Sequence, residues 1–317
     1  MRAFLWDGRG ASVVTDHPDP VASDTMALVE VQLAGICSTD LQILQGYMDF
    51  RGVLGHEFVG VVLEGPPEWI GSRVSGEINF ACHRCSFCAR GQTRHCPNRT
   101  VMGILGSDGA FAQRVRVPWK NLHRIPDTVS DREAVFVEPM AAAFEADVQS
   151  RAYRGGRTLI LGAGKLGLLC GQVLALRGDD VVVLCRHDEA MAKARAVGLE
   201  AVTMDDVGRN YALVVEATGH PDGLATAMQL VRPEGAIVQK TTIAARHEID
   251  IAPLVIHEVS LIGSRCGPFA PAIEALAKGQ VQVAPLLAAV LPLSEAARGI
   301  REASLPGALK IALDPSL

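Results

Sequence analysis

The chain has 317 residues, of which 49% are hydrophobic and 21% charged, and its formal net charge is −5. This length predicts two domains with cores of their own, and the mixing of acids and bases argues against nucleic acid or an anionic membrane as partner. No signal-peptide pattern opens the sequence, and no apolar run approaches the roughly 18 residues of a membrane span, so we expect a cytoplasmic protein. The eight cysteines are then expected to stay reduced, which favours metal binding over disulfides.

The predicted elements change in kind near the middle of the chain. Residues 1 to about 135 are rich in β-branched residues, glycine and proline, which is typical of an irregular, mostly-β region. From Thr158, buried strands alternate with helices, which predicts an α/β domain with a doubly wound parallel sheet. Its predicted strands are 158–161, 181–184, 213–216, 236–238 and 259–262, and its helices are 166–176 and 189–197. After Arg265 the pattern predicts a helix at 271–278 and a strand at 308–313.

Potential metal ligands are spread over the first region. They are Cys37, His56, Glu57 and, later, Glu138. Each alone is more often a packed residue than a ligand. Together they offer a thiolate, an imidazole and carboxylates, and three protein ligands with an open fourth position compose a catalytic zinc site.

The segment after Cys37 has a second, purely structural interpretation. Thr39 is followed three residues later by Gln42, which fits a capping box. The sequence therefore predicts that Thr39 is the N-cap of a short helix.

Four cysteines follow in the spacing C-x2-C-x2-C-x7-C, namely Cys82, Cys85, Cys88 and Cys96. Four thiolates can bind one tetrahedral Zn²⁺, and with cysteine at every position the site would be closed and structural. A 4Fe–4S cluster also takes four thiolates and is the competing metal interpretation. Unrelated buried cysteines are the interpretation without metal, and the expected reducing compartment argues against it.

A glycine-rich segment, Gly162-Ala-Gly164-Lys165-Leu166-Gly167, fits G-x-G-x-x-G between a predicted strand and a predicted helix. Glycines permit a tight turn and a close approach of the backbone to a pyrophosphate at the helix N-terminus. In this context we predict dinucleotide binding rather than an empty structural turn.

The choice between NAD and NADP is predicted at the end of the next strand. An NAD enzyme usually has an acid about 20 residues past the glycines, bonded to the ribose 2′-OH. That place falls on Arg186, followed by His187. A guanidinium attracts a 2′-phosphate, so we predict NADP over NAD, with help from His187. The alternative is that Arg186 is a solvated residue and Asp188 reaches the ribose.

In this order, the motifs resemble the zinc-containing medium-chain dehydrogenase/reductase superfamily along essentially the whole chain. The resemblance rests on 35–40, 55–57, the four cysteines, 137–140 and 162–167. The chain looks like the threonine, sorbitol and glucose dehydrogenase branch, which has Glu-Pro, here 138–139, where liver-type alcohol dehydrogenases have a cysteine. The resemblance implies a GroES-like catalytic domain at 1–139 and 265–317, with a structural zinc lobe at 82–96. It also implies a Rossmann domain at 140–264 and a cleft between the two domains.

The resemblance also implies roles at the catalytic zinc. Cys37 and His56 would bind the metal directly, and Glu57 would lie beside it and exchange with water as a ligand. Glu138 would complete the site, directly or through water. Asp40 would orient His56 from behind.

The expected proton path departs from the family. Thr39 would hold the hydroxyl that takes the substrate proton. Relatives in this branch often have histidine at the position of Gln42, where it passes the proton outward. Glutamine does not titrate, so water or another residue must carry the proton.

Two further expectations rest on the resemblance. The segment 216–219, with Thr218, resembles the part of the family that lines the nicotinamide. A homodimer or homotetramer is also implied, with strand 259–262 as a candidate for pairing across subunits.

We therefore predict a dehydrogenase with two Zn²⁺ per chain that transfers hydride between NADP and a secondary alcohol, polyol or sugar-like substrate. In this reaction the catalytic zinc polarises the substrate oxygen. Two alternatives stay open: a zinc-free quinone or enone reductase of the same superfamily, and a non-catalytic redox sensor that binds zinc and NADP. Metal content and turnover distinguish the three.

Overall fold

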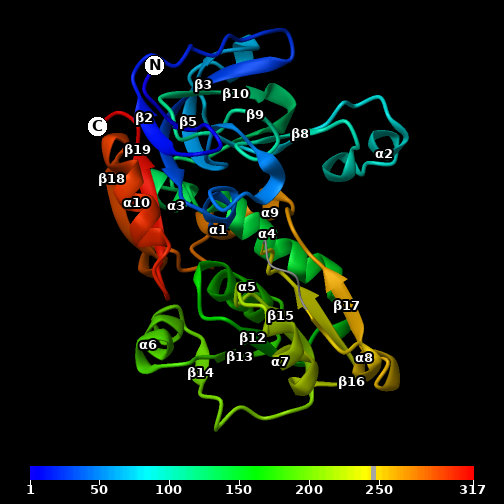
Figure 1. The fold of residues 1–317 in the computed structure, drawn as a ribbon. Helices are drawn as coiled ribbons and strands as arrows, with labels where there is room; N and C mark the ends of the chain where they lie inside the picture. Colours follow the sequence, from blue (N-terminus) through cyan, green and yellow to red (C-terminus); the bar gives the residue numbers. More distant parts are fainter. Residues whose placement is uncertain (244–247) are drawn as a thin grey trace. The chain divides into compact units, whose positions relative to one another are not determined.

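The computed structural model describes residues 1–243 and 248–317, and the chain divides into two compact units (Figure 1). Unit 1 comprises Met1–Glu138, Leu287–Leu305 and Lys310–Leu317, and unit 2 comprises Pro139–Leu286 and Pro306–Leu309.

The return of the chain to unit 1 lies at Leu287 rather than at the predicted residue 265. Side-chain bonding within unit 2 explains the difference. The amide of Gln172 donates to the carbonyl of Gln282 at 3.1 Å and accepts from its backbone N–H at 2.6 Å. Both hydrogen bonds hold the segment before Leu287 to unit 2.

Unit 1 is mostly β-structure. Its strands are β1 (Ala3–Trp6), β2 (Ala11–Val14), β3 (Met26–Gly35), β4 (Gly52–Val53), β5 (Glu57–Glu64), β6 (Arg73–Gly76), β7 (Asn79–Phe80), β8 (Thr100–Met102), β9 (Gly106–Ser107), β10 (Arg114–Pro118), β11 (Leu122–Arg124), β18 (Leu287–Pro292) and β19 (Lys310–Asp314). Its helices are α1 (Ser38–Ile43), α2 (Ser86–Ala89), α3 (Asp131–Ala134) and α10 (Ala296–Ala303).

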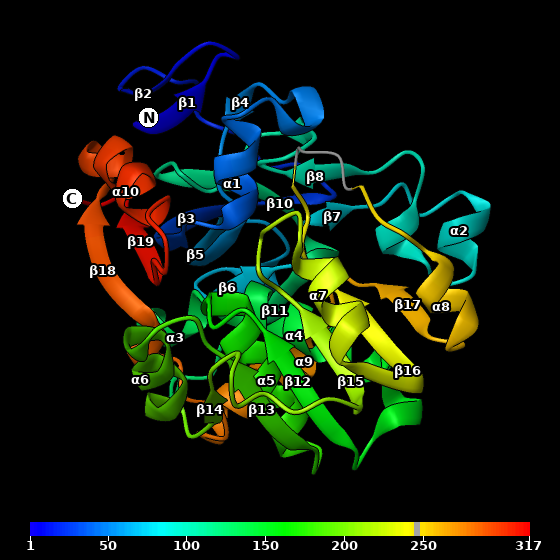
Figure 2. The same cartoon turned by 60° about the horizontal axis from the view of Figure 1, so that its bottom comes forward.

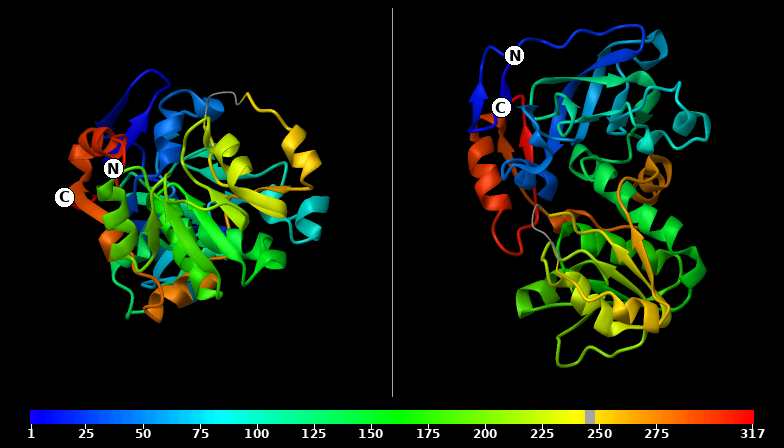
Figure 3. Two further views of the ribbon diagram at one scale, coloured as in Figure 1. Left: turned by 90° about the horizontal axis from the view of Figure 1, so that it is seen from below. Right: turned by 45° about the vertical axis from the view of Figure 1, so that its right-hand side comes forward.

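The main sheet of unit 1 has the order β11-β6-β5-β3-β19-β18, and β10 also pairs with β3. Strand β3 is buried along most of its length because it has neighbours on both sides. Helix α10 packs on β18 and β19, which come from the end of the chain (Figure 3). The sheet that carries the first metal-ligand segments is therefore completed by residues from the far end of the sequence.

Unit 2 alternates strands and helices. Its strands are β12 (Arg157–Leu161), β13 (Asp180–Leu184), β14 (Glu200–Val202), β15 (Tyr211–Glu216), β16 (Val231–Gln239) and β17 (Ser260–Gly263). Its helices are α5 (Lys165–Leu176), α6 (Asp188–Ala196), α7 (Gly223–Leu230), α8 (Ala252–Ile256) and α9 (Phe269–Ala277), and α4 (Val137–Gln149) begins at the boundary of the units.

The sheet of unit 2 is parallel throughout, with the order β14-β13-β12-β15-β16-β17 (Figure 2). From β12, the chain builds the sheet first toward β14 and then, starting at β15, in the opposite direction. Right-handed crossovers in two opposite directions place helices on both faces. Such strands are buried on both faces, which is why they read as continuous apolar runs, and the predicted doubly wound sheet is confirmed.

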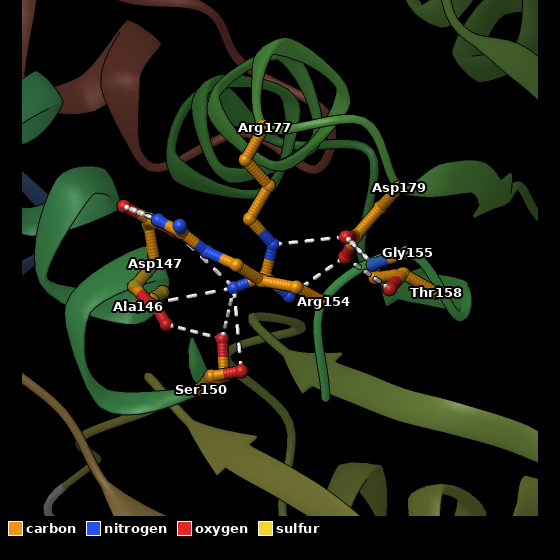
Figure 4. A network of polar contacts seen from close by, with 8 residues as sticks. All are labelled: Ala146, Asp147, Ser150, Arg154, Gly155, Thr158, Arg177 and Asp179. Carbon is orange, nitrogen blue, oxygen red and sulfur yellow. Dashed lines mark hydrogen bonds and ion pairs between the residues drawn. The ribbon is translucent and has the colours of Figure 1, made fainter. Parts of the chain in front are cut away.

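A buried polar network braces the amino ends of β12 and β13 (Figure 4). Arg177 follows α5 and is 5% exposed; its guanidinium donates to Asp179 at 2.7 and 2.9 Å and to Ser150 Oγ at 2.8 Å. Asp179 in turn accepts from Gly155 N at 3.0 Å and from Thr158 Oγ1 at 2.7 Å. The ion pair of Arg177 and Asp179 thus connects the end of α4, the end of α5 and the amino ends of β12 and β13.

Across the part of the chain that the structure describes, none of the helices combines the length and the apolar character needed to cross a lipid bilayer.

Candidate functional site

Neighbouring strands of unit 1 bring the first candidate ligands together. Gly35 at the end of β3 pairs with Glu57 at the start of β5 on one side and with Ala312 of β19 on the other. Cys37 follows β3 directly, and His56 immediately precedes β5. One ligand atom each from Cys37, His56 and Glu57 lies within 4.8 Å of the others. The three residues, separated in sequence, therefore form one group.

Glu138 is not among the residues of that group. Its side chain is buried in the first turn of α4, and its charge contributes to raising the pKa of Lys310. It therefore lies in the electrostatic surroundings of the group, while its predicted role as a ligand stays a prediction.

Asp40 links the two ligand segments. Its Oδ2 accepts from the backbone N–H of Cys37 at 2.8 Å, and its Oδ1 accepts from Gly55 N at 3.3 Å. The same Oδ1 lies 3.3 Å from Nδ1 of His56, and the Asp40 side chain has no exposed surface. This contact is one of charge and not an aligned hydrogen bond, and it places the carboxylate where one that orients a ligand histidine is expected.

The predicted capping box at Thr39 and Gln42 is wrong. Helix α1 begins at Ser38 with Cys37 as its N-cap, and the side chain that bonds back to the cap is that of Asp40. A carboxylate at the third helical position satisfies an otherwise unpaired N–H better than the neutral amide two residues later. Thr39 lies within the first turn instead, where its Oγ1 is 3.8 Å from Sγ of Cys37.

The electrostatics of this group favour a bound cation. Burial, the largest influence, lowers the pKa of His56, but the charges of Asp40 and Cys37 together raise it well above its ordinary value. The same negative charges that favour a proton on the imidazole also favour a metal cation. A thiol, an imidazole and a carboxylate are a suitable donor set for Zn²⁺. The residues present therefore fit the metal that the sequence predicts.

Lys310 is a member of the site that the sequence analysis missed. Its Nζ pairs with Oε2 of Glu57, each side chain is 1% exposed, and Nζ also donates to the carbonyl of Ile36 at 3.3 Å. Burial lowers the pKa of Lys310, but the charges of Glu57, Cys37 and Glu138 more than offset it and raise the pKa. The sequence did contain a sign of this ion pair. Lys310 lies inside the apolar run 308–313, and a lysine in a buried strand needs a partner.

The four remaining predicted metal ligands meet in the segment around α2. Sγ of Cys96 lies 3.5 Å from Sγ of Cys82, and Sγ of Cys85 lies 3.5 Å from that of Cys88 and 3.7 Å from that of Cys96. Thiolates on one tetrahedral Zn²⁺, with bonds of about 2.3 Å, are about 3.8 Å apart. A disulfide would need about 2.05 Å. In a 4Fe–4S cluster each thiolate binds a separate iron, so the sulfurs stand farther apart than on one shared ion.

The environments of these thiols differ. A hydrogen bond from the backbone of Arg84 is the main cause that lowers the pKa of Cys82 to about 6, while burial raises the pKa of Cys88 to about 11. Without metal, the group therefore carries both thiolate and thiol near neutral pH.

The glycine-rich segment forms the turn between β12 and α5. Gly162 has φ +106°, and a Cβ there would lie 2.6 Å from the carbonyl oxygen of Ala217. Gly164 is the N-cap of α5, and a Cβ built on it would meet nothing within 4 Å, while Gly167 packs against the carbonyl of Gly162. Helix α5 begins with Lys165 and Leu166 directly after this turn. The open space at Gly164 leaves the helix N-terminus accessible, which fits a bound pyrophosphate.

Other predicted cofactor residues lie at the carboxyl ends of neighbouring strands. Arg186 and His187 are exposed beyond β13, and Arg186 forms no ion pair within residues 1–243 and 248–317. His187 is the N-cap of α6, where its Nδ1 accepts from Ala190 N at 3.2 Å. Thr218 follows β15, half-buried, with its Cα 3.0 Å from the position of a Cβ on Gly162.

Comparison with known proteins agrees with this division. The family model for the alcohol dehydrogenase GroES-like domain matches residues 23–127, and that for zinc-binding dehydrogenase matches residues 166–278. Sorbitol dehydrogenase of Halalkalibacterium halodurans is 26% identical over 97% of each chain. Starvation-sensing protein RspB of Escherichia coli K12 is 29% identical over 90% of this chain and 91% of its own.

Solved structures are similar over nearly the full length. A zinc-binding dehydrogenase of Sinorhizobium meliloti, bound to NADP, has a TM-score of 0.89 and 27% identity, with 99% of each chain covered. The RspB protein of Escherichia coli CFT073, in complex with NADH, has a TM-score of 0.89 and 28% identity, again with 99% of each chain covered.

A GroES-like unit joined to a Rossmann unit defines a nicotinamide-dependent dehydrogenase. The chain belongs to the zinc-type medium-chain dehydrogenase/reductase superfamily. The predicted family and fold class are confirmed.

Proposed function

We propose that this protein is a zinc-dependent dehydrogenase that transfers a hydride between NADP and a secondary alcohol, polyol or sugar-like substrate. The observation that carries the proposal is the buried group of Cys37, His56 and Glu57, backed by Asp40, in a chain of this superfamily. The similarity to sorbitol dehydrogenase supports the polyol class of substrate.

Zn²⁺ held by Cys37 and His56 would supply a Lewis acid for the substrate oxygen. Asp40 orients the imidazole of His56, so that the nitrogen away from Asp40 is the one available to the metal. The hydroxyl of Thr39, beside Cys37, takes the substrate proton. Gln42 cannot pass that proton on because an amide does not titrate, so water carries it from Thr39.

Glu57 has two possible partners. It lies within reach of a metal bound by Cys37 and His56, and its Oε2 is paired with Lys310. The lysine offsets the charge of the carboxylate and competes with the metal for it. We infer that this competition leaves the fourth position of the zinc available to substrate.

A second Zn²⁺ would be bound by Cys82, Cys85, Cys88 and Cys96. The sulfur separations near 3.5 Å support a single shared ion, and the all-cysteine ligand set supports a closed structural role.

Arg186 is the basis for proposing NADP. Its exposed guanidinium, without an ion pair in the described part of the chain, is available to a 2′-phosphate. His187 accepts at Nδ1 from Ala190 N, so a neutral ring carries its proton on Nε2 and can donate to the same phosphate. Similar structures hold either NADP or NADH, so the residue at position 186 decides the assignment.

We also propose a homo-oligomer that pairs through β17. This strand ends the sheet of unit 2, and Leu261 on it and Val255 and Ile256 on α8 expose large apolar side chains. An edge strand beside apolar side chains favours pairing with a second copy. Its test is the mass of the protein in solution.

The proposed activity is tested with a panel of secondary alcohols, polyols, sugars and hydroxy-amino acids, read by NADPH absorbance. We expect turnover of at least one class, loss of turnover on zinc depletion and recovery on zinc restoration. His56→Ala is expected to reduce the zinc content from about two ions per chain to about one. Quinone or enone reduction that survives complete zinc removal would replace the proposal with the zinc-free reductase, and metal and NADP binding without any turnover would replace it with the redox sensor.

A further inference from the structure

The segment 108–111 of unit 1 runs alongside residues 53–55, which lie directly before the candidate ligand His56. All three carbonyl groups of 53–55 accept hydrogen bonds from its backbone: Val53 from Gly109 N at 2.7 Å, Leu54 from Phe111 N at 2.8 Å and Gly55 from Ala110 N at 2.9 Å. The carboxylate of Asp108 adds a fourth bond, which its Oδ1 accepts from Val53 N at 2.9 Å. The stretch that leads to His56 is therefore held along its length by one other segment.

The ring of Phe111 covers Gly55, the residue bonded directly to His56. Gly55 has φ +93°, a conformation that favours glycine, and a Cβ there would lie only 2.3 Å from Cδ1 of Phe111. Its N–H donates to Oδ1 of Asp40 at 3.3 Å, and its carbonyl accepts from Ala110 N. The ring, the carboxylate and the peptide N–H thus each hold a different part of Gly55.

Phe111 is itself fixed in the core of unit 1. Its side chain has no exposed surface, and its carbonyl accepts from Phe4 N at 2.7 Å. Its ring packs against that of Phe4, with the two ring centroids 6.5 Å apart. Because close packing locks the side chain in place, the ring gives the backbone at Gly55 a rigid surface to rest on.

The imidazole of His56 is not fixed by a hydrogen bond at Nδ1. This atom is buried and, within the described residues, has no hydrogen-bond partner. Oδ1 of Asp40 lies 3.3 Å from it and attracts the ring by charge without an aligned bond. A well-formed site needs its ligand atoms held within about 0.5 Å of their places. The placement of the ring therefore depends on the backbone that carries it.

We propose that Phe111 is a positioning residue for the metal ligand His56, acting through Gly55. The proposal rests on the proposed function, because it requires that Cys37 and His56 bind one ion. Cys37 follows β3 and His56 precedes β5, so the separation of their ligand atoms depends on how firmly each backbone is held. A gap beside Gly55 lets its backbone shift toward the missing ring, and the imidazole then moves relative to the sulfur of Cys37.

The test replaces the ring in the full-length protein and measures metal binding at both sites. Phe111→Leu keeps an apolar side chain but removes the flat surface against Gly55. Competition with a chelator is expected to show a zinc affinity about tenfold weaker at the Cys37–His56 group and an unchanged affinity at the four cysteines. NMR of cadmium-loaded protein distinguishes the sites by their number of sulfur ligands, and only the resonance of the site with one sulfur is expected to shift or broaden.

Phe4→Leu is the matched control. Phe4, on β1, is the other ring of the pair and is 1% exposed, but the three atoms nearest to a Cβ on Gly55 all belong to Phe111. Both variants are expected to unfold at similarly lowered urea concentrations, because each truncates a buried ring. Phe4→Leu should nevertheless keep the zinc affinity of the Cys37–His56 group within about twofold of that of the wild-type protein.

Equal losses of zinc affinity in Phe111→Leu and Phe4→Leu, or no loss in folded Phe111→Leu, would overturn the inference alone. If Phe111→Leu does not fold, Phe111→Met decides the question with the same expectation, because its side chain fills the space but is flexible. A wild-type protein that binds zinc only at the four cysteines would overturn the proposed function with it.

Discussion

At the scale of single residues, the buried ion pair of Lys310 and Glu57 is expected to make the stability of unit 1 depend on metal. Lys310→Met keeps the length of the side chain but leaves Glu57 charged and buried, which costs about 3–5 kcal/mol in the metal-free protein. A bound Zn²⁺ replaces the missing positive charge, so we expect the loss in unfolding free energy to be smaller in zinc-loaded protein. Urea unfolding with and without zinc measures both values.

Lys278→Met is the control for this substitution. Lys278 also pairs with a glutamate, Glu274, but both side chains are exposed, so the loss in unfolding free energy is expected to be far smaller in either state. A loss in Lys310→Met that is the same with and without zinc would show that the pair does not share its charge with the metal.

Arg186 sets the expected cofactor preference. Arg186→Ala removes the guanidinium that would face the 2′-phosphate, so kcat/KM for NADP⁺ is expected to fall about tenfold or more while that for NAD⁺ is retained. Arg195→Ala, which changes an exposed arginine on the helix α6 that follows Arg186, is the control and should change neither value. A wild-type protein that prefers NAD⁺ contradicts the assignment.

At the scale of elements, the four-cysteine segment is expected to bind zinc in a pH-dependent way. Zinc requires thiolates, and without metal the pKa of Cys88 is raised to about 11 by burial, so binding displaces its proton. Affinity should therefore increase as the pH rises toward 11. It should fall more steeply below pH about 6, where Cys82 is protonated as well.

The measurement is competition with a chelator across this pH range in a Cys37→Ser variant, which removes a ligand of the other site. If all four cysteines were already thiolates in the metal-free protein, the zinc affinity would not change between pH about 6 and about 11. That result would contradict the expectation.

Most strands of unit 2 could be predicted from the sequence because each is encoded locally, although the short β14 and the helices α7 and α8 were not. Parallel strands covered on both faces are continuous apolar runs, and the glycines at 162, 164 and 167 mark the turn between the first strand and its helix. The start of α1 was misplaced because a cysteine is an unusual N-cap. The identity of the cap became evident only from the contact of Asp40 with Cys37 N.

Contacts between distant segments were beyond sequence reasoning. The ligand types at 37, 56 and 57 were readable, but Lys310 reaches Glu57 only because β19 pairs with β3. Likewise, Glu216 accepts a hydrogen bond from Gln239, a neighbour in the sheet rather than in the chain. In both cases a buried charge could be suspected from its apolar surroundings, but its partner required the sheet order.

At the scale of the whole molecule, the path of the chain makes unit 1 depend on the C-terminal segment and leaves unit 2 nearly continuous. All of unit 2 except Pro306–Leu309 lies within Pro139–Leu286, whereas unit 1 is completed by β18, β19 and α10. Removal of residues 287–317 exposes the edge of β3 and takes Lys310 away from Glu57. We expect the truncated chain to lose the zinc of the Cys37–His56 group and all turnover, while it still binds NADPH.

NADPH fluorescence and zinc content measure the two outcomes on the same sample. The full-length Lys310→Met variant is the control, because it lacks the positive charge of Lys310 but keeps strand β19. Lys310→Met removes the charge but keeps β19, so it should retain the metal at high zinc concentration, whereas the truncated chain should not. Retention of the catalytic zinc by the truncated chain would mean that β3 and β5 hold the ligands without their neighbour. Loss of NADPH binding would mean that unit 2 does not fold without the strands that follow it.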